Sequence, residues 1–160
     1  MSATGFWIER LRGSAIPLPR CPALSSDEKI LVAAIRLMVV DGLVAPSAAV
    51  AMALKPGSEA VLEALRDWLG QLAGNAVRQI AVGAPLHCCA SPDELALLAA
   101  IEGARCGDFV LVHRIFGHFV DRADIDALAH ATEILSEHLA AAAFTLSKRQ
   151  LPERQRRSLD

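Results

Sequence analysis

The residues best suited to chemistry stand together just before a predicted helix start. Residues 91–94 read Ser-Pro-Asp-Glu, which combines an N-cap serine, a proline at the first helical position and a glutamate three residues after the cap. His87, Cys88 and Cys89 precede this signal directly. Because the N-terminal end of a helix favours negative charge, a thiolate is stabilised there. These three residues are therefore candidates for metal ligation or for a reactive thiol.

The other ligating side chains are scattered along the chain. Cys106 and His113 complete the candidate metal set, and the remaining ones are Cys21, His118 and His130. Sulfur and imidazole ligands would suit zinc or iron. The sequence contains neither Cys-x-x-Cys nor His-x3-His, the close pairs that zinc sites usually use. No cofactor is predicted outright, and zinc or iron stays open as the alternative.

A structural interpretation carries more weight than a chemical one at each of these positions. A free cysteine behaves as a small hydrophobe, so Cys88 and Cys89 would pack beneath the helix start. His113 falls in line with Val112 and Phe116, and a histidine on such a face is more often a satisfied core residue than a ligand. The absence of a triad-like spacing argues against a catalytic thiol.

The elements that must position these side chains are helices. The chain has 160 residues, of which 53% are hydrophobic and 4% aromatic, with no tyrosine. This alanine- and leucine-rich palette is typical of an all-α fold, here a single-domain bundle of about six helices. Ser25 with Glu28 forms a second capping box. The expected helices cover approximately 25–41, 46–54, 58–73, 92–105, 109–120 and 124–144, with a short extended segment near 77–82.

The chain divides into three parts. Residues 1–24, rich in proline and glycine, form an N-terminal arm, and residues 25–146 form the helical domain. Residues 147–160 form a basic tail that we expect to be disordered. No internal repeat is evident.

Composition and missing motifs limit the function classes. No run of about 18 apolar residues occurs, so no membrane span is expected. No export signal is visible, which predicts a cytoplasmic protein with four reduced cysteines. A net charge of −2 gives no reason to expect nucleic acid as a partner. The mean hydropathy of +0.35 instead favours a homo-oligomer that buries an apolar helix face.

A set of short motifs lies within about residues 25–105, and it comprises Ile35-Arg36-Leu37-Met38, Gly42-Leu43, Ala48-Ala49, Arg78, Cys88-Cys89 and Glu94-Leu95. On these motifs, this part of the sequence resembles a group of small uncharacterised alphaproteobacterial helical proteins of unknown function. His87 stands where a third cysteine is expected, which weakens any metal role implied by the group. The resemblance implies no activity.

Three functions remain open on these grounds. The first is a non-catalytic helical interaction or structural protein that forms an oligomer. The second is a metal- or redox-linked protein that uses the segment 87–89, with Cys106 or His113 completing the site. The third is an enzyme with a thiolate nucleophile at the helix start. Of these, the interaction protein is the preferred interpretation, and an enzyme is the less favoured one.

Overall fold

The computed structural model describes residues 21–42, 59–85 and 87–149, and these residues form helices joined by turns and irregular segments. The prediction of an all-α fold is confirmed. The helices are α2 (Ser26–Val40), α4 (Glu59–Asn75), α5 (Pro92–Arg105), α6 (Phe109–Phe116) and α7 (Ile125–Ala141), with a 3-10 turn η1 (Arg122–Asp124) before α7. The predicted helix at 46–54 lies outside the described residues. No helix in these ranges is both long and apolar enough to cross a membrane.

The helix starts follow the capping signals of the sequence. The Ser25 hydroxyl accepts a hydrogen bond from the Glu28 N–H, and the Glu28 carboxylate accepts one from the Ser25 N–H. Ser91 and Glu94 make the same reciprocal pair at the start of α5. Each box satisfies two backbone N–H groups that the first turn of a helix leaves unpaired. Both predicted starts are therefore confirmed.

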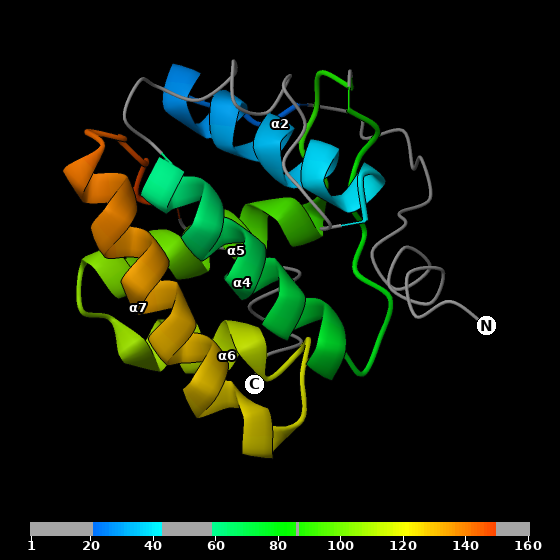
Figure 1. The fold of residues 1–160 in the computed structure, drawn as a ribbon, viewed down its shortest axis with the longest axis vertical. Coiled ribbons are helices and arrows are strands. Elements are labelled where there is room, and N and C mark those ends of the chain that lie inside the picture. The colour runs from blue at the N-terminus through cyan, green and yellow to red at the C-terminus, as the bar shows by residue number, and fades with distance from the viewer. Residues whose placement is uncertain (1–20, 43–58, 86, 150–160) are drawn as a thin grey trace.

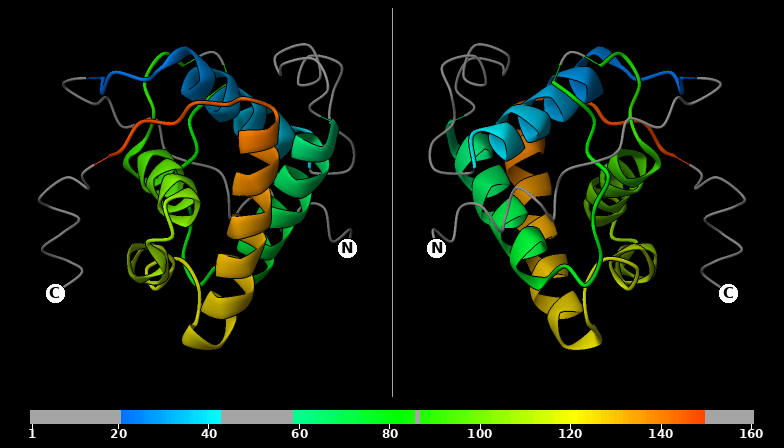
Figure 2. Two further views of the ribbon diagram at one scale, coloured as in Figure 1. Left: turned by 90° about the vertical axis from the view of Figure 1, so that its left-hand side faces the viewer. Right: turned by 90° about the vertical axis from the view of Figure 1, so that its right-hand side faces the viewer.

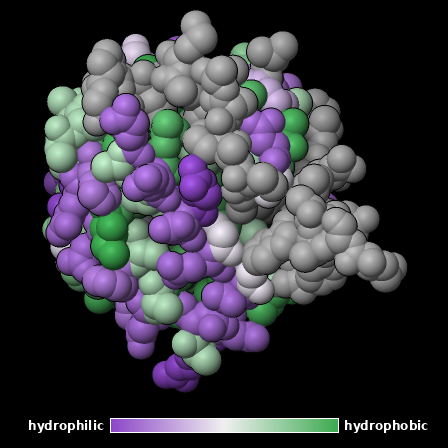
Figure 3. Space-filling model, in the orientation of Figure 1, coloured by the Kyte–Doolittle hydropathy of each residue, from purple (hydrophilic) through white to green (hydrophobic). Residues whose placement is uncertain are grey.

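The core is built from two pairs of packed helices, α4 with α7 and α5 with α6. Helices α4 and α7 run side by side, α2 lies across one end of them, and α5 and α6 lie behind (Figures 1 and 2). Trp68 of α4 is fully buried, and its Nε1 donates to Thr132 Oγ1 of α7 over 2.8 Å. The viewed surface of α4 and α7 is largely hydrophilic (Figure 3). Helices α4 and α7 thus each have one buried and one solvated face.

The segment between α4 and α5 is irregular. Residues 77–82, expected to be extended, form no strand, and the bridge described in this region pairs Ala76 with Val120. Helix α6 ends at Phe116, four residues earlier than expected, and turns lead from it to Val120.

Two helices described in the first half of the chain recur in the second half at one constant offset. Helices α2 and α5 begin at residues 26 and 92, and α4 and α7 begin at residues 59 and 125, so both pairs share an offset of 66 residues. The helices α4 and α7 have the same length of 17 residues. Residues 25–35 read SSDEKILVAAI and residues 91–101 read SPDELALLAAI, with seven identical positions in eleven. The expectation that the chain contains no internal repeat is therefore wrong.

Candidate thiol and metal centre

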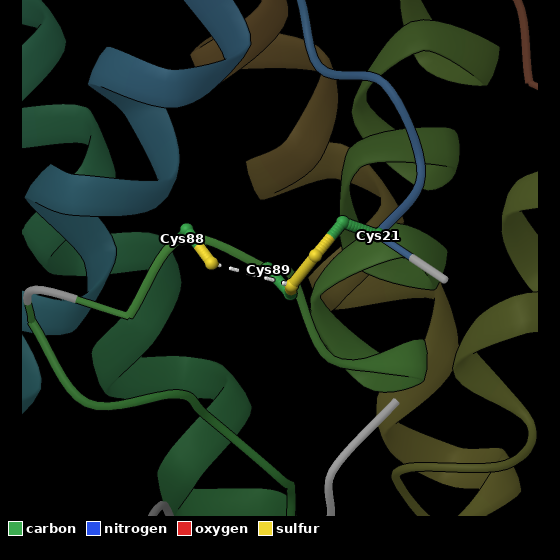
Figure 4. Close-up of side chains that lie close together, drawn as sticks. All are labelled: Cys21, Cys88 and Cys89. Carbon is green, nitrogen blue, oxygen red and sulfur yellow. Dashed lines mark hydrogen bonds between the residues drawn. A yellow bond between two sulfur atoms is a disulfide. The ribbon is translucent and has the colours of Figure 1, made fainter. Parts of the chain in front are cut away.

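Three cysteine side chains meet at the start of α5. Cys21 and Cys89 form a disulfide that joins positions 68 residues apart. The Cys88 Sγ lies 3.5 Å from the Cys89 Sγ, and the three sulfur atoms all lie within 4.8 Å of one another (Figure 4). Cys89 is buried, whereas Cys21 and Cys88 are exposed. The prediction of four reduced thiols is wrong for Cys21 and Cys89.

Two members of the predicted metal set lie elsewhere. Cys106 follows the last turn of α5, at the opposite end of a 14-residue helix that is about 20 Å long. His113 lies on α6, where its ring is exposed and its Nε2 is 3.6 Å from a carboxylate oxygen of Asp126. The interpretation of His113 as a core residue is wrong, because α6 turns this position toward solvent. Neither residue belongs to the three-sulfur group.

Three further histidines, His87, His118 and His130, also fall outside the sulfur group. The His87 Nδ1 contacts the backbone of Cys89, 3.1 Å from its carbonyl oxygen and 3.3 Å from its nitrogen. His118 is partly buried, and burial together with the nearby Arg78 guanidinium lowers its pKa. His130 is exposed, 3.5 Å from a Glu133 oxygen. His130 therefore lies on the solvated face of α7.

Arg36 of α2 holds the cysteine segment in place. Its guanidinium binds the Glu94 carboxylate in a bidentate manner, with Nε–Oε1 and Nη2–Oε2 distances of 2.7 and 2.8 Å. Nη2 also donates to the Cys89 carbonyl over 2.7 Å, and Nη1 donates to the His87 carbonyl. The Arg36 and Glu94 side chains are 4% and 0% exposed. A planar, buried guanidinium thus fixes the backbone on both sides of Cys88.

Glu94 completes this network because each of its oxygens has a second donor. Oε1 accepts from the Gly83 N–H over 3.0 Å, and Oε2 accepts from the Ser91 N–H over 2.7 Å. A buried ion pair needs such additional hydrogen bonds to offset its loss of hydration. The network therefore joins α2, the segment before α5 and the α5 cap.

Gly83 makes room for the guanidinium. A Cβ atom at this position would lie 2.6 Å from Arg36 Nη2 and 2.8 Å from Cζ. We expect Gly83→Ala to lower the free energy of unfolding by about 2 kcal/mol or more, because the guanidinium is held by its acceptors and cannot move without losing them. Urea denaturation measures the change.

Gly70→Ala is the matched control for this variant. A Cβ at Gly70, inside α4, would meet nothing within 4 Å, so alanine should stabilise the helix by up to about 1 kcal/mol. A Gly83→Ala variant as stable as Gly70→Ala would contradict the close packing of Arg36.

A second arginine and carboxylate pair supports the other side of the α5 start. Arg78 binds both oxygens of Asp93, with distances of 2.8 and 2.9 Å, and its Nε donates to the His118 carbonyl. Its guanidinium carbon lies 4.5 Å from the centre of the Phe119 ring. Arg78 therefore links the start of α5 to the turns that follow α6.

Arg149 makes a corresponding pair at the start of α2. Its guanidinium binds the buried Glu28 carboxylate, with an Nη2–Oε2 distance of 2.6 Å, and Nη2 donates to the Ala23 carbonyl over 3.2 Å. Burial by itself raises the pKa of Glu28, but the hydrogen bonds from Arg149, Ser25 and Ser147 outweigh it, and the pKa is lowered. Arg149, which the sequence assigns to the basic tail, is thus part of the packed structure.

The chemistry available at this centre is that of sulfur. The three cysteines offer soft thiolate ligands for a thiophilic metal ion once the disulfide is reduced, and a disulfide with a neighbouring free thiol when it is oxidised. Cys88 provides an accessible sulfur at this centre.

About half of this site could be predicted from the sequence. Residue types and the place before the α5 cap predict the segment 87–89, whereas Arg36 figures only among the residues that carry the family resemblance. A single charge inside the otherwise apolar stretch Ile30–Val40 was the available signal, because such a residue needs a buried partner. Cys21 carried no comparable signal.

No family model, no curated protein and no solved structure matches the chain. For this reason, its function can be proposed only from the geometry of the site. The resemblance to a group of small alphaproteobacterial proteins therefore stays a prediction.

Proposed function

We propose that the protein holds a thiol-based metal centre. In the reduced form, Cys21, Cys88 and Cys89 bind one thiophilic cation. In the oxidised form, Cys21 and Cys89 are joined by their disulfide. The observation that carries this proposal is the convergence of three sulfur atoms within 4.8 Å. The disulfide brings Cys21 to Cys89 across 68 residues, and Cys88 adds a free thiol beside it.

Zinc is the favoured ion, and iron is the alternative. Thiolates bind zinc tightly, and three protein ligands leave a fourth tetrahedral position for a water molecule or an external ligand. His87 neighbours the site, but its Nδ1 contacts the Cys89 backbone. Binding would release protons, because each ligating thiol must lose one.

Metal titration of the reduced protein tests the proposal. We expect one zinc ion per chain, measured against a chromophoric chelator, and sulfur-to-metal charge-transfer absorption when cobalt replaces zinc. Cys21→Ser, Cys88→Ser and Cys89→Ser should each weaken binding by about tenfold or more. Cys106→Ser is the matched control, because this exposed thiol lies at the far end of α5.

The titration has a clear contrary outcome. Zinc binding that is weak in the wild-type protein, or that falls equally in Cys106→Ser and Cys88→Ser, would refute the three-sulfur site. Loss of binding only in His87 variants would point to a different ligand set.

A homo-oligomeric interaction protein is the second candidate. Phe109 and Val110 begin α6 and are 38% and 79% exposed, which is unusual for adjacent large apolar residues. We expect light scattering to show a dimer or larger species that Val110→Asp converts to monomers. A wild-type protein that stays monomeric at high concentration would remove this candidate.

A further inference from the structure

The caps of α2 and α5 receive the same contacts from distant extended segments. The Ser25 hydroxyl donates to the Thr145 carbonyl, and the Ser91 hydroxyl donates to the Ala81 carbonyl. The carboxylates two residues further on accept from the same two distant residues. Asp27 accepts from the Thr145 N–H and Asp93 from the Ala81 N–H, over 2.7 and 2.8 Å.

The capping-box glutamates extend this match. The Glu28 Oε1 accepts from the Ser147 N–H, and the Glu94 Oε1 accepts from the Gly83 N–H, both over 3.0 Å. Each extended segment follows the longer helix of one half, α7 or α4, and binds the cap of the other half. The two halves therefore exchange these segments.

Two arginines make matching contacts with the two caps, although they stand at different positions of the repeat, Arg36 within α2 and Arg149 after α7. In both pairs Nε faces the glutamate Oε1 and Nη2 faces Oε2. In both pairs Nη2 also donates to the carbonyl two residues before the N-cap serine. That carbonyl belongs to Cys89 for Arg36 and to Ala23 for Arg149.

We infer that the three-cysteine site is the junction of two copies of one structural unit, and that Arg36 and Arg149 are its two positioning residues. Each arginine fixes the backbone of the segment that precedes one cap, and each of these segments brings cysteine to the junction. Arg36 fixes the segment of Cys88 and Cys89, and Arg149 fixes the segment of Cys21. The inference rests on the proposed thiol centre.

Arg36 holds its backbone segment more firmly than Arg149 holds the other one. The Arg36 side chain is 4% exposed and binds two carbonyls, whereas that of Arg149 is 15% exposed and binds one. Loss of Arg149 should therefore free the Cys21 segment while Cys88 and Cys89 keep their places. Loss of Arg149 is therefore expected to weaken zinc binding and disulfide formation only when Cys21 is present.

Two measurements on the full chain test the role of Arg149. The first is the zinc affinity of the reduced protein, and the second is the equilibrium between the Cys21–Cys89 disulfide and glutathione, which requires no metal. In the second, two glutathione thiols are oxidised to one glutathione disulfide while the protein disulfide takes up two electrons and two protons. The zinc affinity and the glutathione equilibrium both depend on how often the Cys21 sulfur meets the Cys89 sulfur. A melting temperature does not report this encounter directly.

Arg149→Ala should weaken zinc binding by up to about tenfold, less than the loss of the Cys21 sulfur itself, because Arg149 holds the Ala23 carbonyl and does not contact that sulfur. It should also shift the glutathione equilibrium toward the dithiol by about tenfold. In the Cys21→Ser background, Arg149→Ala should not change zinc affinity further. Arg149→Lys keeps the charge without the bidentate geometry, so its zinc affinity and glutathione equilibrium should lie between those of the wild type and Arg149→Ala. It replaces the alanine variant if that variant fails to fold.

Arg105→Ala is the matched control, because Arg105 makes a similar pair with Glu102 at the other end of α5. Equal behaviour of the Arg149 and Arg105 variants in both measurements would overturn the inference. An additive effect in the Cys21→Ser background would overturn it as well. A wild-type protein that binds no zinc, but whose disulfide equilibrium shifts in Arg149→Ala, would refute the metal centre and leave the positioning role standing.

Discussion

Replacement of Arg36 by methionine is expected to lower the free energy of unfolding by about 3–5 kcal/mol. The Glu94 side chain is 0% exposed, and methionine leaves its charge buried without a cation. Removing one partner of a buried ion pair destabilises a protein by this amount, even where the intact pair contributes little. The carbonyls of His87 and Cys89 also lose their donor, so the cysteine segment loosens.

Urea denaturation of Arg36→Met and Arg105→Ala measures this difference. The Arg105 side chain is 38% exposed, whereas its partner Glu102 is 5% exposed, so Arg105→Ala should cost more than the loss of a surface ion pair and less than Arg36→Met. The double variant Arg36→Met with Glu94→Gln should recover part of the loss, because it removes the uncompensated charge. An Arg36→Met variant within 1 kcal/mol of the wild type would show that the pair is not buried as described.

Reduction of the Cys21–Cys89 disulfide is expected to lower the free energy of unfolding by about 4 kcal/mol. The cross-link joins residues 68 positions apart, and closing a loop of this length removes conformational entropy from the unfolded chain. The measurement is denaturation with and without a reductant, in the presence of a chelator so that metal binding does not restore stability.

Two variants separate this effect from other actions of the reductant. Cys21→Ser should have the stability of the reduced wild type and should not respond to reductant. Cys106→Ser should respond as the wild type does, since its thiol is free. A wild-type protein whose unfolding midpoint is unchanged by reduction would contradict the cross-link.

The cysteine pairing bears on the expected cellular location. Structural disulfides are rare in cytosolic proteins, where those that form are usually transient and redox-sensing. The predicted cytoplasmic location, which stays a prediction, thus agrees better with a reversible thiol centre than with a permanent cross-link.

The sequence by itself determined the helices and their starts, because these depend on neighbours in the chain. Ser25 with Glu28, and Ser91 with Glu94, satisfy the first N–H groups of a helix from three residues away. Apolar spacing fixed which face of α4 would be buried. The same local information placed His87, Cys88 and Cys89 at a helix start.

Only the tertiary structure decided what meets at that start. Cys21 reaches Cys89 across 68 residues, and Arg36 reaches Glu94 across 58. Such pairings depend on how the helices pack, and periodicity carries no information about that. The seven identical positions of residues 25–35 and 91–101 are visible in the sequence, but only the structure shows that the segment after each longer helix binds the cap of the other half. A short run of residue types therefore predicted a thiol site, and the packing of two similar halves supplied its third sulfur and its arginines.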